Sequence, residues 1–174
     1  MKKKIFGLCG WSGSGKTDLI CRLLNYFSSN KLIVSTIKHT HHNFNIDKKG
    51  KDTFLHKEAG AYEVLINGEY NWAHMHYGQE DEEIRLIDLI QKISENTDLI
   101  LVEGFKNSKI NKIEIYNSKL NKPLLFKTDH YIKGIVVDGL NIEFRYQKLE
   151  TFNFSETEKI AKFILKNAKN EYPE

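Results

Sequence analysis

The stretch that decides the fold is GLCGWSGSGKTDLICRLL, residues 7–24. Its segment Gly10–Thr17 matches G-x-x-x-x-G-K-[ST] at every fixed position, which is the pattern of a phosphate-binding loop. The apolar run Ile5–Cys9 precedes the pattern, and apolar residues recur at helical spacing after it. A strand, a glycine loop and a helix in this order are the setting in which the pattern binds phosphate. A glycine turn with a chance Lys-Thr pair is the alternative, and this setting argues against it.

The residue types in the loop suit a bound polyphosphate. Glycines permit backbone angles that turn consecutive N–H groups inward, and no side chain then blocks the approach of the anion. The following helix directs its positive end at the same point. We expect Lys16 to reach the β- and γ-phosphates and the Thr17 hydroxyl to bind Mg²⁺. The predicted nucleotide-binding residues of the loop are Gly10, Ser12, Gly13, Ser14, Gly15, Lys16, Thr17 and Asp18.

The remaining patterns predict a single domain over residues 1–174. Strands are expected at residues 5–9, 32–37, 98–102, 113–116, 124–126 and 135–137. Helices are expected at 17–27, 54–59 and 84–93, with a last helix opened by a capping box at Ser155–Glu158. Asn67-Gly68 separates two extended runs and indicates an antiparallel hairpin at one edge of the sheet. Strands that alternate with helices predict an α/β, three-layer P-loop NTPase fold with a largely parallel sheet.

Composition narrows the class of protein further. The chain has 174 residues and a net charge of +3, which is too small and too dispersed to indicate a nucleic-acid surface. No run approaches the ~20 apolar residues of a membrane helix. Cys9 and Cys21 fall in a predicted strand and helix, so both are expected to be reduced and buried. We therefore expect a cytoplasmic protein that binds neither nucleic acid nor membrane.

A second acidic group is needed near the Mg²⁺, at the tip of a neighbouring parallel strand. The run Asp98–Val102 is apolar after its first residue and ends at Glu103-Gly104. Glu103 is therefore the candidate to hold a water of the Mg²⁺ or to orient the attacking water, and with Lys16 it forms the predicted catalytic pair. Glutamate is one methylene longer than the usual aspartate, which favours contact through water. A solvated charge at a strand end is the alternative.

The polar segment His39–Thr53 is too long for an ordinary connection and is rich in histidine. One interpretation is a transition-metal site formed by His39, His41 and His42. Another is a switch loop that senses the γ-phosphate or Mg²⁺ through Asp47 or Asp52. A third is a cationic group that holds a second anionic ligand or a partner, formed by Lys38, His41, Lys51 and His56. A solvated polar loop is the fourth.

Four blocks of the sequence together resemble the MobB family, the molybdopterin-guanine dinucleotide biosynthesis adapters. The blocks are Gly10–Thr17, then Ile37–His42, then Gly50–Thr53 with His56 and Ala59–Ala61, and last Leu101–Lys106. They cover roughly the first two-thirds of the chain. Many NTPases share the phosphate loop, but its combination with His-Thr-His-His and Gly-Lys-Asp is much more specific.

The resemblance implies a dimeric protein that binds GTP with Mg²⁺ and hydrolyses it weakly. It also implies a partner, the guanylyltransferase that attaches GMP to molybdopterin, and leaves open whether molybdopterin itself binds. Asp47, Asp52 and Glu103 become candidates near the metal, and the predicted metal ligands are Thr17, Asp47 and Glu103. The histidine loop would face a second anionic ligand or the partner enzyme. Asp129, which follows a predicted strand, is the candidate acceptor for the guanine edge. Asp18 replaces the commoner threonine after Thr17 and, being close to the phosphates, is expected to weaken nucleotide binding.

Two other functions fit parts of the pattern. Small-molecule kinases are often compact P-loop chains, but they usually carry an arginine-rich lid. This chain has only three scattered arginines, Arg22, Arg85 and Arg145. A metallochaperone-type GTPase would use the histidines to carry Ni or Zn. The absence of an obvious arginine finger or water-orienting glutamine predicts slow hydrolysis, because such groups are worth ~10³–10⁵ in rate.

Overall fold

The computed structural model describes residues 3–40, 44, 46–77, 84–138 and 149–170. The chain divides into two compact units, residues 1–39 with 85–174 and residues 40–84. The first unit holds six strands in one sheet, in the order β2-β5-β1-β6-β7-β8. These strands are β1 (Lys4–Cys9), β2 (Val34–Lys38), β5 (Leu99–Glu103), β6 (Lys112–Tyr116), β7 (Ile132–Val137) and β8 (Glu150–Asn153). Every neighbouring pair is parallel, as the alternation of strands and helices predicts.

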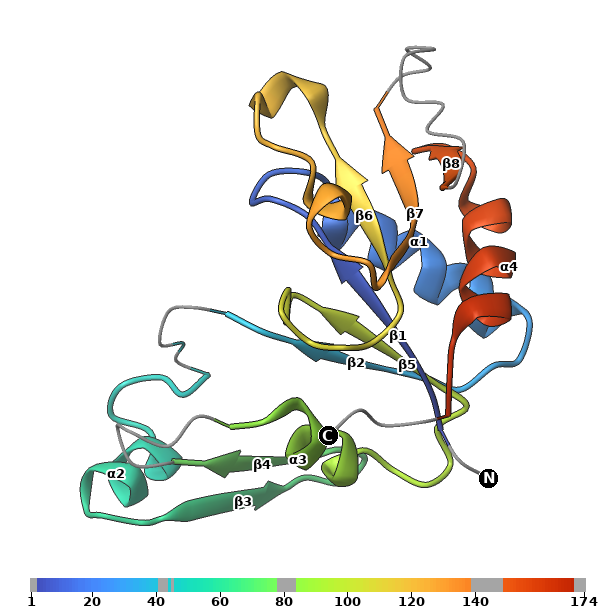
Figure 1. Cartoon of the computed structure of the whole chain (residues 1–174). Helices are drawn as coiled ribbons and strands as arrows, with labels where there is room; N and C mark the ends of the chain where they lie inside the picture. Colours follow the sequence, from blue (N-terminus) through green and yellow to red (C-terminus); the bar gives the residue numbers. More distant parts are fainter. Residues whose placement is uncertain (1–2, 41–43, 45, 78–83, 139–148, 171–174) are drawn as a thin grey trace. The chain divides into compact units, whose positions relative to one another are not determined.

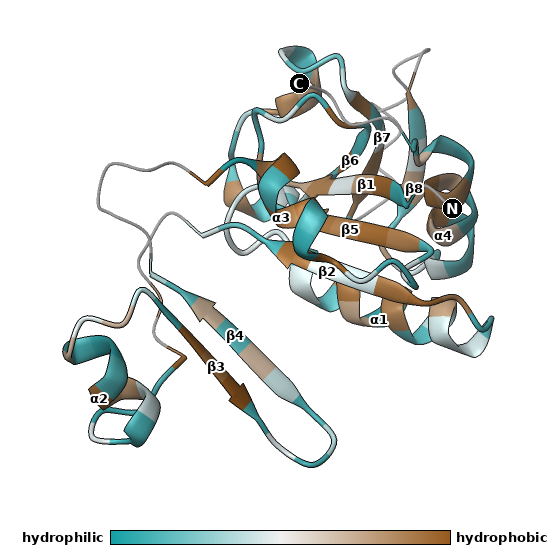
Figure 2. Ribbon diagram, turned by 90° about the horizontal axis from the view of Figure 1, so that it is seen from below, coloured by the Kyte–Doolittle hydropathy of each residue, from teal (hydrophilic) through white to brown (hydrophobic). Residues whose placement is uncertain are grey.

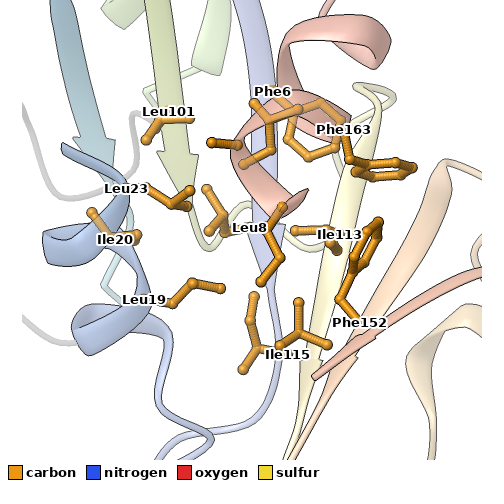
Figure 3. Packing of buried hydrophobic residues seen from close by; sticks show 14 of the residues in the cluster. Phe6, Leu8, Leu19, Ile20, Leu23, Leu101, Ile113, Ile115, Phe152 and Phe163 are labelled. Atoms are coloured by element: carbon orange, nitrogen blue, oxygen red, sulfur yellow. The ribbon is translucent and has the colours of Figure 1, made fainter. Parts of the chain in front are cut away.

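Helices cover both faces of this sheet, so the predicted three layers are confirmed (Figure 1). α1 (Lys16–Ser29) and α4 (Thr157–Asn167) pack on one face, where they bury apolar side chains against β1, β5 and β6. Figure 3 shows Leu19 and Leu23 of α1 facing Leu8 of β1. α3 (Leu86–Lys92) packs on the other face with Ile90 against Ile5, Ile100 and Val102. β5 is apolar from Leu99 to Val102 because both of its faces are covered (Figure 2).

The second unit contains α2 (Asp52–Glu58) and an antiparallel pair, β3 (Glu63–Asn67) and β4 (Trp72–His76). The predicted hairpin is confirmed, but it forms a two-stranded sheet of its own and is not an edge of the parallel sheet. Gly60 follows the end of α2, with φ at 98°, and its N–H donates to the Lys57 carbonyl at 2.9 Å.

One expected strand is absent and one strand is present without having been predicted, each for a physical reason. Residues 124–126 are not a strand: Leu125–Lys127 form the 3₁₀ helix η2, and a second one, η1, spans Ser118–Leu120. The amides of Leu125 and Phe126 each donate to the Glu114 carboxylate at 2.9 Å, so neither is available to a strand. β8 was not expected, because its four residues are too short and too polar to stand out in the sequence.

The start of α4 also differs from the expectation. No side chain caps the helix at Glu156, so the predicted capping box at Ser155 is wrong. Two hydrogen bonds form nearby instead, both at Asn153, the last residue of β8. The Asn153 Oδ1 accepts from the Ser155 N–H at 3.0 Å, and the Glu156 Oε2 accepts from the Asn153 N–H at 2.8 Å. This pair fixes the turn that leads from β8 into α4.

Candidate functional site

The loop between β1 and α1 has the geometry of a phosphate cradle. Gly10, Gly13 and Gly15 have φ of 149°, 79° and 96°, which side chains rarely allow. A Cβ on Gly10 would lie 2.4 Å from the Ile115 carbonyl oxygen, and one on Gly15 would lie 2.8 Å from the Phe154 ring. The glycines at positions 10 and 15 are therefore required by close packing as well as by backbone angle.

Lys16 folds back over the loop. Its ammonium donates to the carbonyls of Gly10 at 3.1 Å and Trp11 at 2.8 Å. Burial lowers the pKa of Lys16, and the nearby Glu103 carboxylate opposes that shift. Lys16 is thus held at the mouth of the cradle by two weak neutral acceptors. An anionic ligand would replace them with stronger, charge-assisted contacts.

The first turn of α1 supplies the expected hydroxyl. Thr17 is exposed at the start of the helix. Asp18 forms an ion pair with Arg22 one turn later, at 3.0 Å, so its charge is partly compensated. Ser12 is exposed, whereas Ser14 is buried and its Oγ has no hydrogen-bond partner within the described residues.

Glu103 lies at the end of β5, and β5 pairs directly with β1. The register places Glu103 opposite Leu8, and the Gly104 N–H donates to the Leu8 carbonyl at 3.2 Å. The Glu103 side chain is mostly buried, and its carboxylate lies 3.7 Å from the ammonium of Lys38 at the end of β2. Three parallel strands therefore bring Glu103, Lys38 and the phosphate loop to the same edge of the sheet. An exposed hydroxyl and a carboxylate near a phosphate cradle are oxygen donors of the kind that Mg²⁺ prefers, so Thr17 and Glu103 fit this ion.

His39 directly follows β2 and lies beside Glu103 at this edge of the sheet. Its N–H donates to the Glu103 carbonyl at 2.8 Å, and its ring stacks on Phe105 with centroids 4.5 Å apart. His41 and His42 lie outside the described residues. The described part of the chain contains no group of three or more His, Cys, Asp or Glu side chains placed to hold a metal ion.

Trp11 connects the phosphate loop to two neighbouring segments, a role that the motif does not reveal. Its indole N–H donates to the Pro123 carbonyl at 2.8 Å. The ammonium of Lys106 lies 4.3 Å from the ring centroid, and that of Lys122 lies 5.7 Å from it. Both distances are in the range of cation–π attraction.

Asp129 lies on the wall of a pocket that also includes Cys9, the residue before the loop. Its Oδ2 accepts from the Lys112 ammonium at 2.7 Å, and its Oδ1 accepts from the Tyr131 N–H at 2.9 Å. The predicted contact of Asp129 with a guanine edge stays a prediction. Lys112 is 1% exposed. Polar and apolar residues alternate around it in the sequence, and this pattern does not reveal that its side chain is buried.

Asp47, the other predicted metal ligand, belongs to the second unit. The Thr53 hydroxyl donates to its Oδ1 at 2.7 Å, and the Tyr77 hydroxyl donates to its Oδ2 at 3.2 Å. Asp52 lies nearby in sequence, at the first residue of α2. The role of Asp47 at a metal stays a prediction.

Both cysteines are free, but only Cys9 is buried. The expectation that Cys21 is buried is wrong, because this position of α1 faces away from the apolar side of the helix. No helix in the described residues combines the length and apolar character needed to cross a membrane.

Known proteins resemble this chain in sequence and in fold. The family model described as MobB, molybdopterin guanine dinucleotide synthesis protein B, matches residues 5–138. The molybdopterin-guanine dinucleotide biosynthesis adapter protein of Haemophilus influenzae is 38% identical over 135 residues, which are 77% of this chain and 74% of that protein. The protein of the same name from Escherichia coli is 30% identical over 164 residues, covering 92% and 91%.

Solved structures that superpose on this chain belong to the same family as its sequence relatives. The crystal structure of Bacillus subtilis MobB superposes with a TM-score of 0.72 at 26% identity, covering 97% of this chain and 99% of that one. A crystal structure of molybdopterin-guanine biosynthesis protein B gives the same TM-score and identity over 93% and 98%. With its phosphate loop, its parallel sheet and these relatives, the chain belongs to the MobB family.

Proposed function

We propose that this protein binds GTP with Mg²⁺ and acts as an adapter in the synthesis of molybdopterin guanine dinucleotide. The observation that carries the proposal is the glycine cradle of residues 10–15, over which Lys16 folds back. The cradle follows β1, and Glu103 ends the neighbouring strand β5 at the same edge of the sheet. The names of the family and its relatives support the pathway. The partner we propose is the guanylyltransferase that attaches GMP to molybdopterin, in the cytoplasm.

Each group has a proposed task in this site. Loop amides and the Lys16 ammonium bind the β- and γ-phosphates, so Lys16 exchanges its two carbonyl contacts for phosphate oxygens. The Thr17 hydroxyl holds the Mg²⁺, which neutralises phosphate charge when bound. Glu103 orients a water at the metal or beside the γ-phosphate.

We propose that hydrolysis by the isolated protein is slow. Arg22 is engaged with Asp18, with the Thr157 hydroxyl and with the Phe154 ring. Arg85 is paired with Asp88 in α3, at 2.9 Å. Arg145 lies outside the described residues. The two described arginines thus have structural partners, and a partner protein is the natural source of any activating group.

A second copy of the chain is the other proposed partner. Leu65 of β3 and Trp72 of β4 lie on the same face of the hairpin, as the strand register requires. Both are about two-thirds exposed, at 65% and 67%, whereas Val64 on the opposite face is buried. β3 is strongly apolar despite this exposure (Figure 2). Two large apolar side chains exposed on one face are typical of an interface between subunits.

Calorimetric titration with GTP and ATP in the presence of Mg²⁺ tests the nucleotide proposal. We expect GTP to bind more tightly than ATP. Lys16→Ala should weaken GTP binding by at least tenfold, because each charge-assisted phosphate contact is worth about 1.5–3 kcal/mol. Lys119→Ala, an exposed lysine in η1, is the matched control and should bind normally. Flat titrations of folded wild-type protein with both nucleotides would refute the proposal.

A further inference from the structure

An aspartate and an arginine form an ion pair on α1 beside the phosphate loop. Asp18 lies in the first turn of the helix, and its Oδ2 accepts from Arg22 Nε at 3.0 Å. The first amides of a helix have no acceptor within it, and in α1 they are among the amides proposed to bind phosphate. An uncompensated carboxylate within one turn of these amides would repel the phosphates. None of the tasks proposed for the GTP site involves Arg22.

Two further contacts hold the guanidinium of Arg22 in this place. Its Nη1 donates to the hydroxyl of Thr157, the first residue of α4, and its Cζ lies 4.6 Å from the centroid of the Phe154 ring. The second contact is in the range of cation–π attraction. Phe154 itself packs beside the loop, since a Cβ on Gly15 would lie 2.8 Å from its ring. The guanidinium is therefore fixed next to the first turn of α1 by groups outside that helix.

The stability of α1 alone does not account for this arrangement. Arg22 Nη2 is buried, and it has no hydrogen-bond partner within the described residues. Burying an N–H group without an acceptor costs free energy, whereas an ion pair between exposed side chains contributes little. A pair that only stabilised the helix would leave the arginine in water.

A second ion pair, on α4, shows the contrast. Glu158 lies in the first turn of that helix, and its carboxylate is 2.6 Å from the ammonium of Lys162, again four residues later. Both of these side chains are about two-thirds exposed, at 63% and 67%, whereas that of Arg22 is 30% exposed. The spacing and the order of the charges are the same, so burial of the basic partner distinguishes the pair beside the phosphate loop.

We propose that Arg22 is a positioning residue for phosphate binding and that it acts through Asp18. The guanidinium compensates the carboxylate charge at the end of α1 where the phosphates bind, and it holds the carboxylate along the helix, away from the loop. Arg22 itself needs no contact with the ligand. This inference rests on the proposed phosphate site and goes beyond it, because it does not depend on which base the nucleotide carries.

Calorimetric titrations with GTP and with tripolyphosphate, which has no base, test this role in the presence of Mg²⁺. Arg22→Met removes the charge and keeps an unbranched apolar chain, so the Asp18 carboxylate is left uncompensated. We expect it to weaken binding of both ligands about fivefold at low salt. Asp18→Asn with Arg22→Met should bind within about twofold of wild type, because both charges are then absent. Arg22→Lys keeps the charge and should also bind within about twofold of wild type.

Salt and the ion pair on α4 separate charge compensation from packing. At 1 M salt the Debye length is about 3 Å, so the difference between Arg22→Met and wild type should shrink to less than about twofold. Lys162→Met leaves Glu158 uncompensated in the same way and is the matched control, which should bind as wild type does.

The outcomes distinguish this role from the phosphate site on which it rests. Unchanged binding by Arg22→Met overturns the role of Arg22 and leaves the site intact. A loss that persists at 1 M salt and in the double substitution also overturns it, because packing would then be the cause. Flat titrations of the wild type with both ligands refute the site itself. Binding of tripolyphosphate alone, with the expected ratios, supports the role of Arg22 and counts against GTP as the ligand.

Discussion

At the scale of single residues, burial determines the ionisation and reactivity of side chains, which the residue type alone does not settle. Lys112 and Glu114 alternate with Ile113 and Ile115, a pattern typical of a strand with one face in water. Both charged side chains are nevertheless buried, because the crossing segments 104–111 and 117–131 cover that face of β6. The cost of burying them is offset by hydrogen bonds to backbone groups and to Asp129.

Glu114 makes the stability of the folded chain depend on pH, and the direction of this dependence follows from its pKa shift. Burial raises the pKa of Glu114, while the amides of Leu125 and Phe126 oppose the shift and the Asp129 charge adds to it. Protonation is then easier in the folded chain than in the unfolded one, so the stability that it contributes is complete below pH 4.5 and is lost as the pH rises through the folded pKa. The melting temperature of the wild type minus that of Glu114→Gln should fall from about pH 4.5 to about pH 7. A difference that stays constant or rises with pH would contradict this.

The two thiols should differ in reactivity. Burial is the main cause that raises the pKa of Cys9 to about 12, with the Glu114 and Asp129 charges adding to it, so this thiol stays protonated and inert. Cys21 is exposed on α1. Iodoacetamide should therefore add one label to the native chain, at Cys21, and two after unfolding, as counted by mass spectrometry. Labelling of native Cys9 at the rate of Cys21 would show that the β1 end is open to solvent.

At the scale of elements, the phosphate loop depends on its neighbours as much as on its own sequence. β6 places the Ile115 carbonyl against Gly10, and the turn before α4 places the Phe154 ring against Gly15. A methyl group on Gly13 would meet only the Leu120 side chain, at 3.7 Å, which is ordinary contact. The three glycines of one motif therefore differ in what a methyl group would meet.

Substitutions at two of these glycines should separate packing from backbone strain. Gly10→Ala combines a disfavoured φ with a collision against fixed backbone, and we expect it to lower the free energy of unfolding by roughly 2–4 kcal/mol. Gly13→Ala meets only the backbone strain, so a loss of about 1–2 kcal/mol is expected. Urea denaturation of both variants measures the difference. Equal losses would mean that the contact with Ile115 does not constrain the loop.

At the scale of the whole molecule, the second unit is a hairpin and a short helix that leave apolar side chains uncovered. Leu65 and Trp72 share one face with Glu63, whose carboxylate lies 3.3 Å from the His74 ring nitrogen and 2.9 Å from that of His76. A two-stranded sheet is marginally stable by itself. A second chain packed on this face would bury the apolar pair and stabilise the hairpin.

Light scattering with size-exclusion chromatography tests the dimer. We expect wild type to elute at twice the mass of one chain. Leu65→Lys with Trp72→Lys should shift it toward the monomer, because two charges would be buried at the interface. Ile33→Lys is the matched control, since Ile33 is an exposed apolar residue of the first unit, and it should leave the dimer intact. A monomeric wild type, or a dimer that survives the double substitution, contradicts the interface.

The parts of this protein that local chemistry controls can be predicted from the amino-acid sequence alone. The glycine spacing of residues 10–15, the apolar runs of β1 and β5 and the periodicity of α1 depend on short-range preferences, and each is present where the pattern predicts it. Contacts between distant residues emerge only in the folded chain. Lys112 meets Asp129, Glu114 turns residues 125–127 into a 3₁₀ helix, and Trp11 receives Lys106, because strand order brings these segments together. The turn of the hairpin is local, but whether the hairpin joins the parallel sheet depends on the rest of the chain. In the folded protein β3 and β4 form a sheet of their own.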